Sequence, residues 1–147
     1  MGGCASHRTD SSPTSHVVAL TIEIQAWALT AGWANYINIA GDTLTIVRHD
    51  DFGSAPKELW RKRLDEGQVK NLNQILASIP VDRLKEEYLD PHIVDGWLAR
   101  FKLSTSDGQT KVIAVWNIRQ PDLAKLVDAT NAIVPKEHQI YFESFEY

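Results

Sequence analysis

Two short segments of this 147-residue chain combine histidine with carboxylates, the residue types of general bases and metal ligands. They are His49-Asp50-Asp51 and the segment 90–96, which holds His92 and Asp95. Neighbouring strand residues point to opposite faces, so the first triplet alone cannot close around an ion. His49, Asp51, His92 and Asp95 together could serve a metal-assisted hydrolase, with His92 and Asp95 as a base and its orienting carboxylate. Asp-Pro and Asp-Gly are also turn dipeptides, and for 90–96 we favour this structural interpretation.

Other catalytic and cofactor motifs are missing from the sequence. No serine stands in a Gly-x-Ser-x-Gly elbow, and the eight glycines never form a P-loop or a dinucleotide-binding pattern. We therefore expect no cofactor. The chain has 15 basic and 19 acidic residues, a formal net charge of −4 at pH 7, which argues against a nucleic-acid partner because phosphate binding requires a concentrated positive field.

The aromatic residues offer a different kind of site. Trp27 falls on the polar side of an alternating segment, and Trp33 lies in the expected turn beside Tyr36. Exposed tryptophan and tyrosine side chains are typical of protein contacts and of sugar stacking. The sequence therefore predicts a ligand-binding group of Trp27, Trp33 and Tyr36 for a protein or glycan partner. The alternative is that a bulge shifts the strand so that these rings cover the core.

The single cysteine, Cys4, follows Gly2 and Gly3 and precedes a polar run that ends at His16. One cysteine cannot form an internal disulfide, so it leaves the compartment open. No stretch approaches the roughly 18 apolar residues of a membrane helix, so we expect membrane contact only through a lipidated Cys4. We predict a flexible tether over residues 1–16 and one domain over 17–147.

Gly3-Cys4 and the Ser/Thr/Asp/Pro tether after it resemble the lipidation site of bacterial lipoproteins. Residues 79–135 are also similar to domains of uncharacterised bacterial envelope lipoproteins, with a short helix, an Asp-Gly turn, two strands and a closing helix. The resemblance implies a lipid-anchored protein of the periplasm or cell surface and brings no catalytic residues with it. Two alternatives remain: myristoylation of Gly2 with Cys4 as a second acylation point, and an ordinary start of a cytoplasmic protein.

Alternating apolar residues predict the strands of the domain. In the first strand, Val18, Leu20, Ile22 and Ile24 share one side, and Gly41-Asp42 predicts a hairpin turn. The expected strands cover residues 17–28, 36–40, 43–48, 57–64, 97–104 and 111–117, with a short helical turn within 81–88.

Two amphipathic segments predict helices. Asp65 and Gln68 have the spacing of a capping box, which starts a helix that runs to about Ser78. Pro121 suits the first turn of a second helix, which Pro135 ends. Because the links between strands are short, the sequence predicts an α+β domain of two layers, with an antiparallel sheet of about five to six strands and two main helices packed on one face.

Taken together, the sequence favours a non-enzymatic binding domain tethered at a bacterial envelope. It would recognise a protein, as an inhibitor or immunity protein does, or a glycan. The metal-assisted hydrolase is the alternative.

Overall fold

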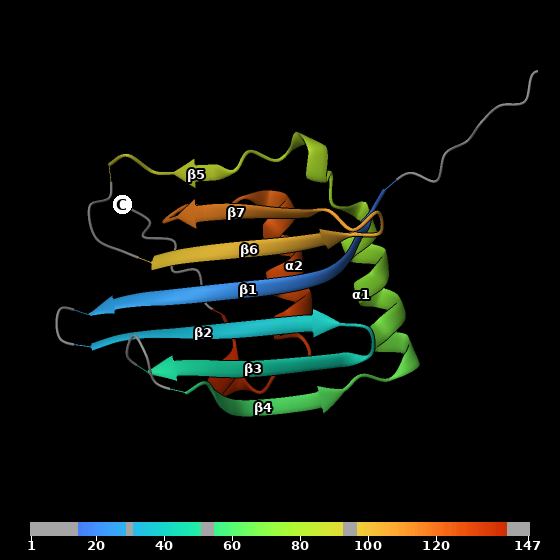
Figure 1. Ribbon diagram of the computed structural model, residues 1–147, viewed down its shortest axis with the longest axis horizontal. Coiled ribbons are helices and arrows are strands. Elements are labelled where there is room, and N and C mark those ends of the chain that lie inside the picture. The colour runs from blue at the N-terminus through green and yellow to red at the C-terminus, as the bar shows by residue number, and fades with distance from the viewer. Residues whose placement is uncertain (1–14, 29–30, 51–54, 93–96, 141–147) are drawn as a thin grey trace, which may run out of the picture.

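The computed structural model describes residues 15–28, 31–50, 55–92 and 97–140 (Figure 1). It shows an α+β fold in which two helices accompany one sheet, and two 3₁₀ turns lie at Val81–Arg83 and Lys136–His138. The elements are β1 (Val17–Ala28), β2 (Ala31–Ala40), β3 (Thr43–Asp50), β4 (Lys57–Arg63), α1 (Glu66–Ser78), β5 (Glu87–Leu89), β6 (Trp97–Thr105), β7 (Thr110–Trp116) and α2 (Pro121–Asn131).

The sheet has seven strands within the described residues, in the order β4-β3-β2-β1-β6-β7-β5. All neighbouring strands are antiparallel except β5 and β7, which are parallel. The first four strands form a meander, and β6 then pairs with the free side of β1. β1 is therefore the middle strand and has hydrogen-bonded neighbours on both sides.

The predicted count of five to six strands was too low because β5 was not expected. The 3₁₀ turn at the start of 81–88 ends at Arg83, and Glu87–Leu89 then pairs with β7, with Tyr88 opposite Val115. A three-residue strand is too short to show a period of two in the sequence. Tyr88 packs half-buried against the core, which holds this short segment on the edge of the sheet.

β2 begins five residues earlier than predicted. Ala31 and Gly32 belong to the strand, and Gly32 pairs with Trp27 of β1. Glycine weakens a strand interior but does not end it where the neighbouring strand supplies a full set of backbone partners. The β1–β2 hairpin is consequently long. The predicted turn before β3 is confirmed, with Gly41 in the left-handed region at a φ of +59°.

Alternation along β1 divides its side chains between core and surface. Leu20 and Ile22 are fully buried, as predicted, but Val18 is 43% exposed. The register with β6 shifts between Val17 and Ala19, so Val17 takes the buried place instead. A bulge of this kind adds one residue to a strand and reverses the side on which the following residue falls. The prediction that Val18 shares one side of the strand with Leu20 and Ile22 was therefore wrong.

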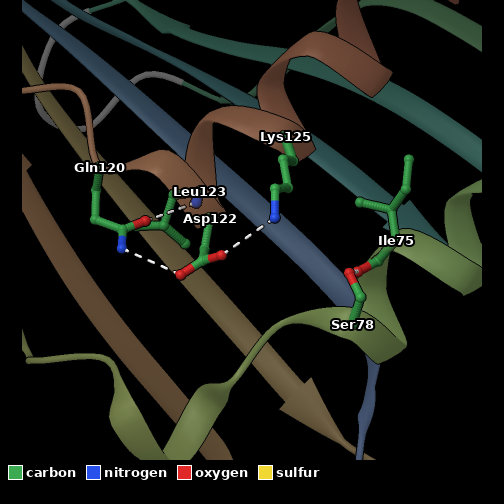
Figure 2. Close-up of polar contacts among 6 residues, drawn as sticks. All are labelled: Ile75, Ser78, Gln120, Asp122, Leu123 and Lys125. Carbon is green, nitrogen blue, oxygen red and sulfur yellow. Dashed lines mark hydrogen bonds and ion pairs between the residues drawn. The ribbon is translucent and has the colours of Figure 1, made fainter.

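The predicted capping box starts α1. Asp65 accepts a hydrogen bond from the Gln68 backbone N–H at 2.8 Å, and the Gln68 side chain accepts from the Asp65 N–H at 3.1 Å. At the other end, the Ser78 hydroxyl donates to the Ile75 carbonyl at 2.7 Å (Figure 2). α1 buries Leu72 and Leu76.

α2 begins at Pro121, as predicted, and the residue before it, Gln120, is an N-cap that was not predicted. The side-chain oxygen of Gln120 accepts from the Leu123 backbone N–H at 2.8 Å, and Lys125 reaches Asp122 at 3.4 Å (Figure 2). The helix buries Leu123, Leu126 and other apolar residues in the same core cluster as α1 and the sheet. Both helices lie behind the sheet in Figure 1, α2 behind its middle and α1 across the strand ends on one side.

Replacing Asp65 with alanine removes the carboxylate that accepts from the Gln68 backbone N–H, while the backbone N–H at position 65 can still donate to Gln68. We expect Asp65→Ala to lower the free energy of unfolding by about 1 kcal/mol, a typical value for loss of an N-cap. Urea denaturation followed by circular dichroism measures the change. Asn73→Ala, at an exposed position within the same helix, is the control and should be neutral or slightly stabilising. Equal stability of Asp65→Ala and wild type would contradict a capping role.

Candidate functional site

The sheet face opposite α1 and α2 is the candidate site, and we call it the open face. No helix of the described chain covers it (Figure 1). Directly paired residues of antiparallel strands share a face, so the register assigns its positions. The central ones are Thr21, Glu23 and Gln25 of β1, Tyr36 and Asn38 of β2, Arg100 and Lys102 of β6, and Val112 and Ala114 of β7.

A polar cluster lies at the middle of this face. The same carboxylate oxygen of Glu23, Oε1, accepts hydrogen bonds from the Gln25 amide, from the Tyr36 hydroxyl at 3.3 Å and from the Arg100 guanidinium at 3.4 Å. The Glu23 side chain is only 17% exposed, whereas that of Arg100 is 39% exposed. We call these four residues the Glu23 cluster. Its carboxylate is fixed by three donors, while its arginine stays accessible.

Strand pairing explains why these residues meet. Glu23 lies directly opposite Tyr36 on β2 and directly opposite Arg100 on β6. Cross-strand neighbours have Cβ atoms about 5 Å apart, within reach of long polar side chains. Gln25 follows two residues after Glu23 on the same strand and so shares its face. The site therefore depends on the register of β1 with both of its neighbours.

Tyr36 connects the Glu23 cluster to His49, one of the residues considered for a metal site. Burial raises the pKa of Tyr36 above its ordinary value, and the negative charge and hydrogen bond of Glu23 raise it further, while Arg100 lowers it. The Tyr36 ring also contacts His49 edge-on, with ring centroids 4.9 Å apart. At neutral pH, Tyr36 is thus a protonated hydrogen-bond donor in a fixed orientation.

The predicted aromatic group is only partly visible. Tyr36 belongs to the Glu23 cluster, and the backbones of Trp27 and Trp33 pair with Gly32 and Ala26 in the β1–β2 hairpin. The side chains of Trp27 and Trp33 lie outside the described part of the structure. Their role in ligand binding stays a prediction.

The structure does not bring the two predicted histidines together. His49 is on β3, and His92 follows β5, which is five strand positions away in the sheet. At about 4.8 Å per strand the separation is roughly 24 Å, and three residues after β5 cannot span it. Among the described residues no group of three His, Cys, Asp or Glu could hold a metal ion. Asp51 and Asp95 lie outside the described residues.

Asp90 has the structural role that its sequence context suggested. Its carboxylate accepts a hydrogen bond from the His92 backbone N–H at 2.9 Å, the geometry of an Asx turn. His92 itself is exposed. Cys4 is in the undescribed residues 1–14, so lipidation there stays a prediction. Among the described helices, none has the length and apolar character needed to cross a bilayer.

Leu98 shows that one end of the open face is shielded from solvent. This residue pairs with Gln25 of β1 and with Trp116 of β7, on the side away from the helices, and yet it is fully buried. The exposed part of the face begins beside it. Val112 of β7 is 48% exposed, and Leu89, opposite Trp116 on β5, is 52% exposed.

Three members of the Glu23 cluster were not among the predicted site residues. Glu23, Gln25 and Arg100 were not singled out from the sequence. The alternation of β1 together with the hairpin could have placed Glu23 near Tyr36. Arg100 is 77 residues from Glu23, and no local pattern in the sequence indicates that pairing.

Comparison of the chain with known protein families, curated proteins and solved structures finds no match.

The cluster makes a prediction about the ionisation of Tyr36. Glu23→Gln removes the negative charge that holds up the pKa of Tyr36, so the pKa should fall toward its ordinary value of 10.0. NMR titration of the ¹³Cζ resonance of Tyr36 measures it, and Glu58→Gln on β4 is the control. An unchanged Tyr36 titration in Glu23→Gln would contradict the cluster.

The same pKa has a consequence for stability. Because the folded-state pKa of Tyr36 lies above the unfolded one, its contribution is fully present below about pH 10 and is lost as the pH rises through the folded value. Ionisation would place a second negative charge beside Glu23. The alkaline loss of stability should therefore be smaller in Tyr36→Phe, as measured by urea denaturation at pH values on both sides of 10.

Proposed function

We propose that this protein is a non-enzymatic binding domain that recognises a protein partner with its open face. The observation that carries the proposal is the Glu23 cluster, a set of mutually hydrogen-bonded polar side chains in the middle of a sheet face that the described helices leave uncovered. A half-buried, fixed carboxylate with an accessible arginine beside it is unusual for a purely solvated surface.

The residue types of the cluster favour a protein partner. Tyrosine and arginine are enriched among the residues that contribute most to protein binding energy. Glu23 holds Tyr36 and Arg100 in place before any partner arrives, so fewer side-chain rotamers are lost on binding. The exposed apolar residues Val112 and Leu89 add surface whose removal from water favours association.

The two edges of the sheet are poor candidates for the binding surface. β4 is rich in charged residues, and its Arg61 is bonded to Glu58 at 2.7 Å and its Arg63 to Asp42 at 2.8 Å. These donors lower the pKa of Glu58 and of Asp42. The other edge strand, β5, has three residues. Charged and very short edge strands disfavour pairing with another chain, which leaves the face as the interaction surface.

The test compares three immobilised baits for capture of proteins from a lysate of the source organism, quantified by mass spectrometry. The baits are wild type, the open-face variant Tyr36→Ala/Arg100→Ala and the helix-side control Lys70→Ala/Asn73→Ala. Loss of two anchor residues should reduce capture of a specific partner by roughly tenfold or more, while the helix-side control captures it like wild type. Circular dichroism checks that all three baits are folded.

Two outcomes would contradict the proposal. A partner retained equally by the open-face variant and by wild type would place the binding surface elsewhere. Binding of wild type to an immobilised glycan panel, abolished by Tyr36→Ala/Arg100→Ala and without any protein captured, would replace the protein partner by a sugar.

A further inference from the structure

One half of the open face, next to the β2–β3 turn, has basic residues and no acidic ones. The register places two rows of paired positions there, and none of these positions is Asp or Glu. The rows are Val112, Lys102, Thr21, Asn38, Thr45 and Arg61, and Thr110, Ser104, Ala19, Ala40, Thr43 and Arg63. We call this region the acid-free half. It contrasts with the net charge of −4 of the whole chain.

Lys102 is the central free charge of this region. Arg61 and Arg63 are bonded at the rim to Glu58 and Asp42, whereas exposed Lys102 makes no hydrogen bond or ion pair with any described residue. It lies between Thr21 of β1 and Val112 of β7, which is 48% exposed. A positive charge and an apolar surface therefore lie side by side, and the neighbouring positions are small or carry hydroxyl groups.

Arg100, a member of the Glu23 cluster, adds a second positive charge next to Lys102. It lies two residues before Lys102 on the same strand and the same face. Within the described residues, its contact with an acidic side chain is through Nη1 to Glu23 at 3.4 Å. A guanidinium has five N–H donors, so most of those of Arg100 remain for an incoming group.

We propose that the acid-free half receives an acidic segment of the protein partner. The carboxylates of that segment bind Lys102 and, in the adjoining row, Arg100, and an apolar side chain of the same segment covers Val112. This inference rests on the proposed function and names the chemistry of the partner. Lys102 and an Arg100 that is paired with Glu23, on a chain of net negative charge, do not make the concentrated positive field that a nucleic acid requires.

The proposal is tested by NMR on the full-length ¹⁵N-labelled protein. The probe is a short capped peptide in which glutamates alternate with valines, and its counterpart carries lysine in place of every glutamate. Amide shift changes should cluster on β6, β7 and β1 with the glutamate peptide and be absent with the lysine peptide. The affinity should fall as sodium chloride is raised, because exposed charges are screened.

Variants with matched charge changes locate the interaction. Lys102→Glu should weaken binding of the glutamate peptide by roughly fivefold or more, since it replaces an attraction with a repulsion. Lys70→Glu makes the same charge change on α1 and should bind like wild type. Both positions are exposed, so both variants should fold, which the dispersion of the amide spectrum verifies.

The results separate this inference from the proposed function. Three outcomes would overturn the proposal that the acid-free half binds an acidic segment. They are equal binding of both peptides, shift changes on the helices, and equal weakening by Lys102→Glu and Lys70→Glu. If a captured partner still depends on Tyr36 and Arg100 in that case, the open face stays the binding surface. If capture does not depend on them, the proposed function fails as well.

Discussion

The alternation of side chains along β1 is the constraint on which the rest of the structure depends. This strand has paired neighbours on both sides, and its apolar set, represented by Leu20 and Ile22, packs with Phe101 and Leu103 of β6 and with equivalent residues of β2. Burial of one such side chain contributes about 1.5–3 kcal/mol, whereas an exposed ion pair contributes about 0–1 kcal/mol. The core therefore sets the register, and the register brings the Glu23 cluster together. A slip of one residue would turn the polar set into the core.

Much of the fold was predictable because its signals are local. The capping box of Asp65 and Gln68, the proline at the start of α2 and the turn at Gly41 all act within a few residues. The alternation of β1 gave its bounds, and the short links between strands gave the antiparallel pairing. An α+β domain with one sheet and two main helices follows from these features alone.

The parts that were not predicted depend on contacts between distant segments. β5 is held on the sheet by pairing with β7 rather than by a pattern of its own, and the exposure of Val18 follows from a bulge against β6. The pairing of Arg100 with Glu23 requires β6, which follows the meander, α1 and β5 along the chain, to lie beside the middle strand β1. A single sequence has no local pattern that indicates which distant strands pair. For the same reason, adjacent histidine and aspartate residues suggested a metal site, but His49 lies on β3 and His92 follows β5, at the far edge of the sheet.

The proposed function rests on the sheet face that the described helices leave uncovered. Apolar residues of α1 and α2 share one core with the sheet, and the charged and short edge strands discourage edge pairing. The accessible part of the open face carries an arginine and a tyrosine held by a shared carboxylate. A protein surface with fixed polar groups and nearby exposed apolar side chains fits recognition better than catalysis, since binding requires only complementary shape and charge.

The central claim is that this face is accessible while the helix-side face is not. The most direct measurement is the relaxation of methyl protons by a soluble paramagnetic gadolinium chelate, recorded for Val112 and Ile113, which are neighbours on β7 and fall on opposite faces. The account predicts strong relaxation enhancement for Val112 and little for Ile113. Equally strong protection of both methyl groups would mean that another layer covers the open face, and it would contradict the account.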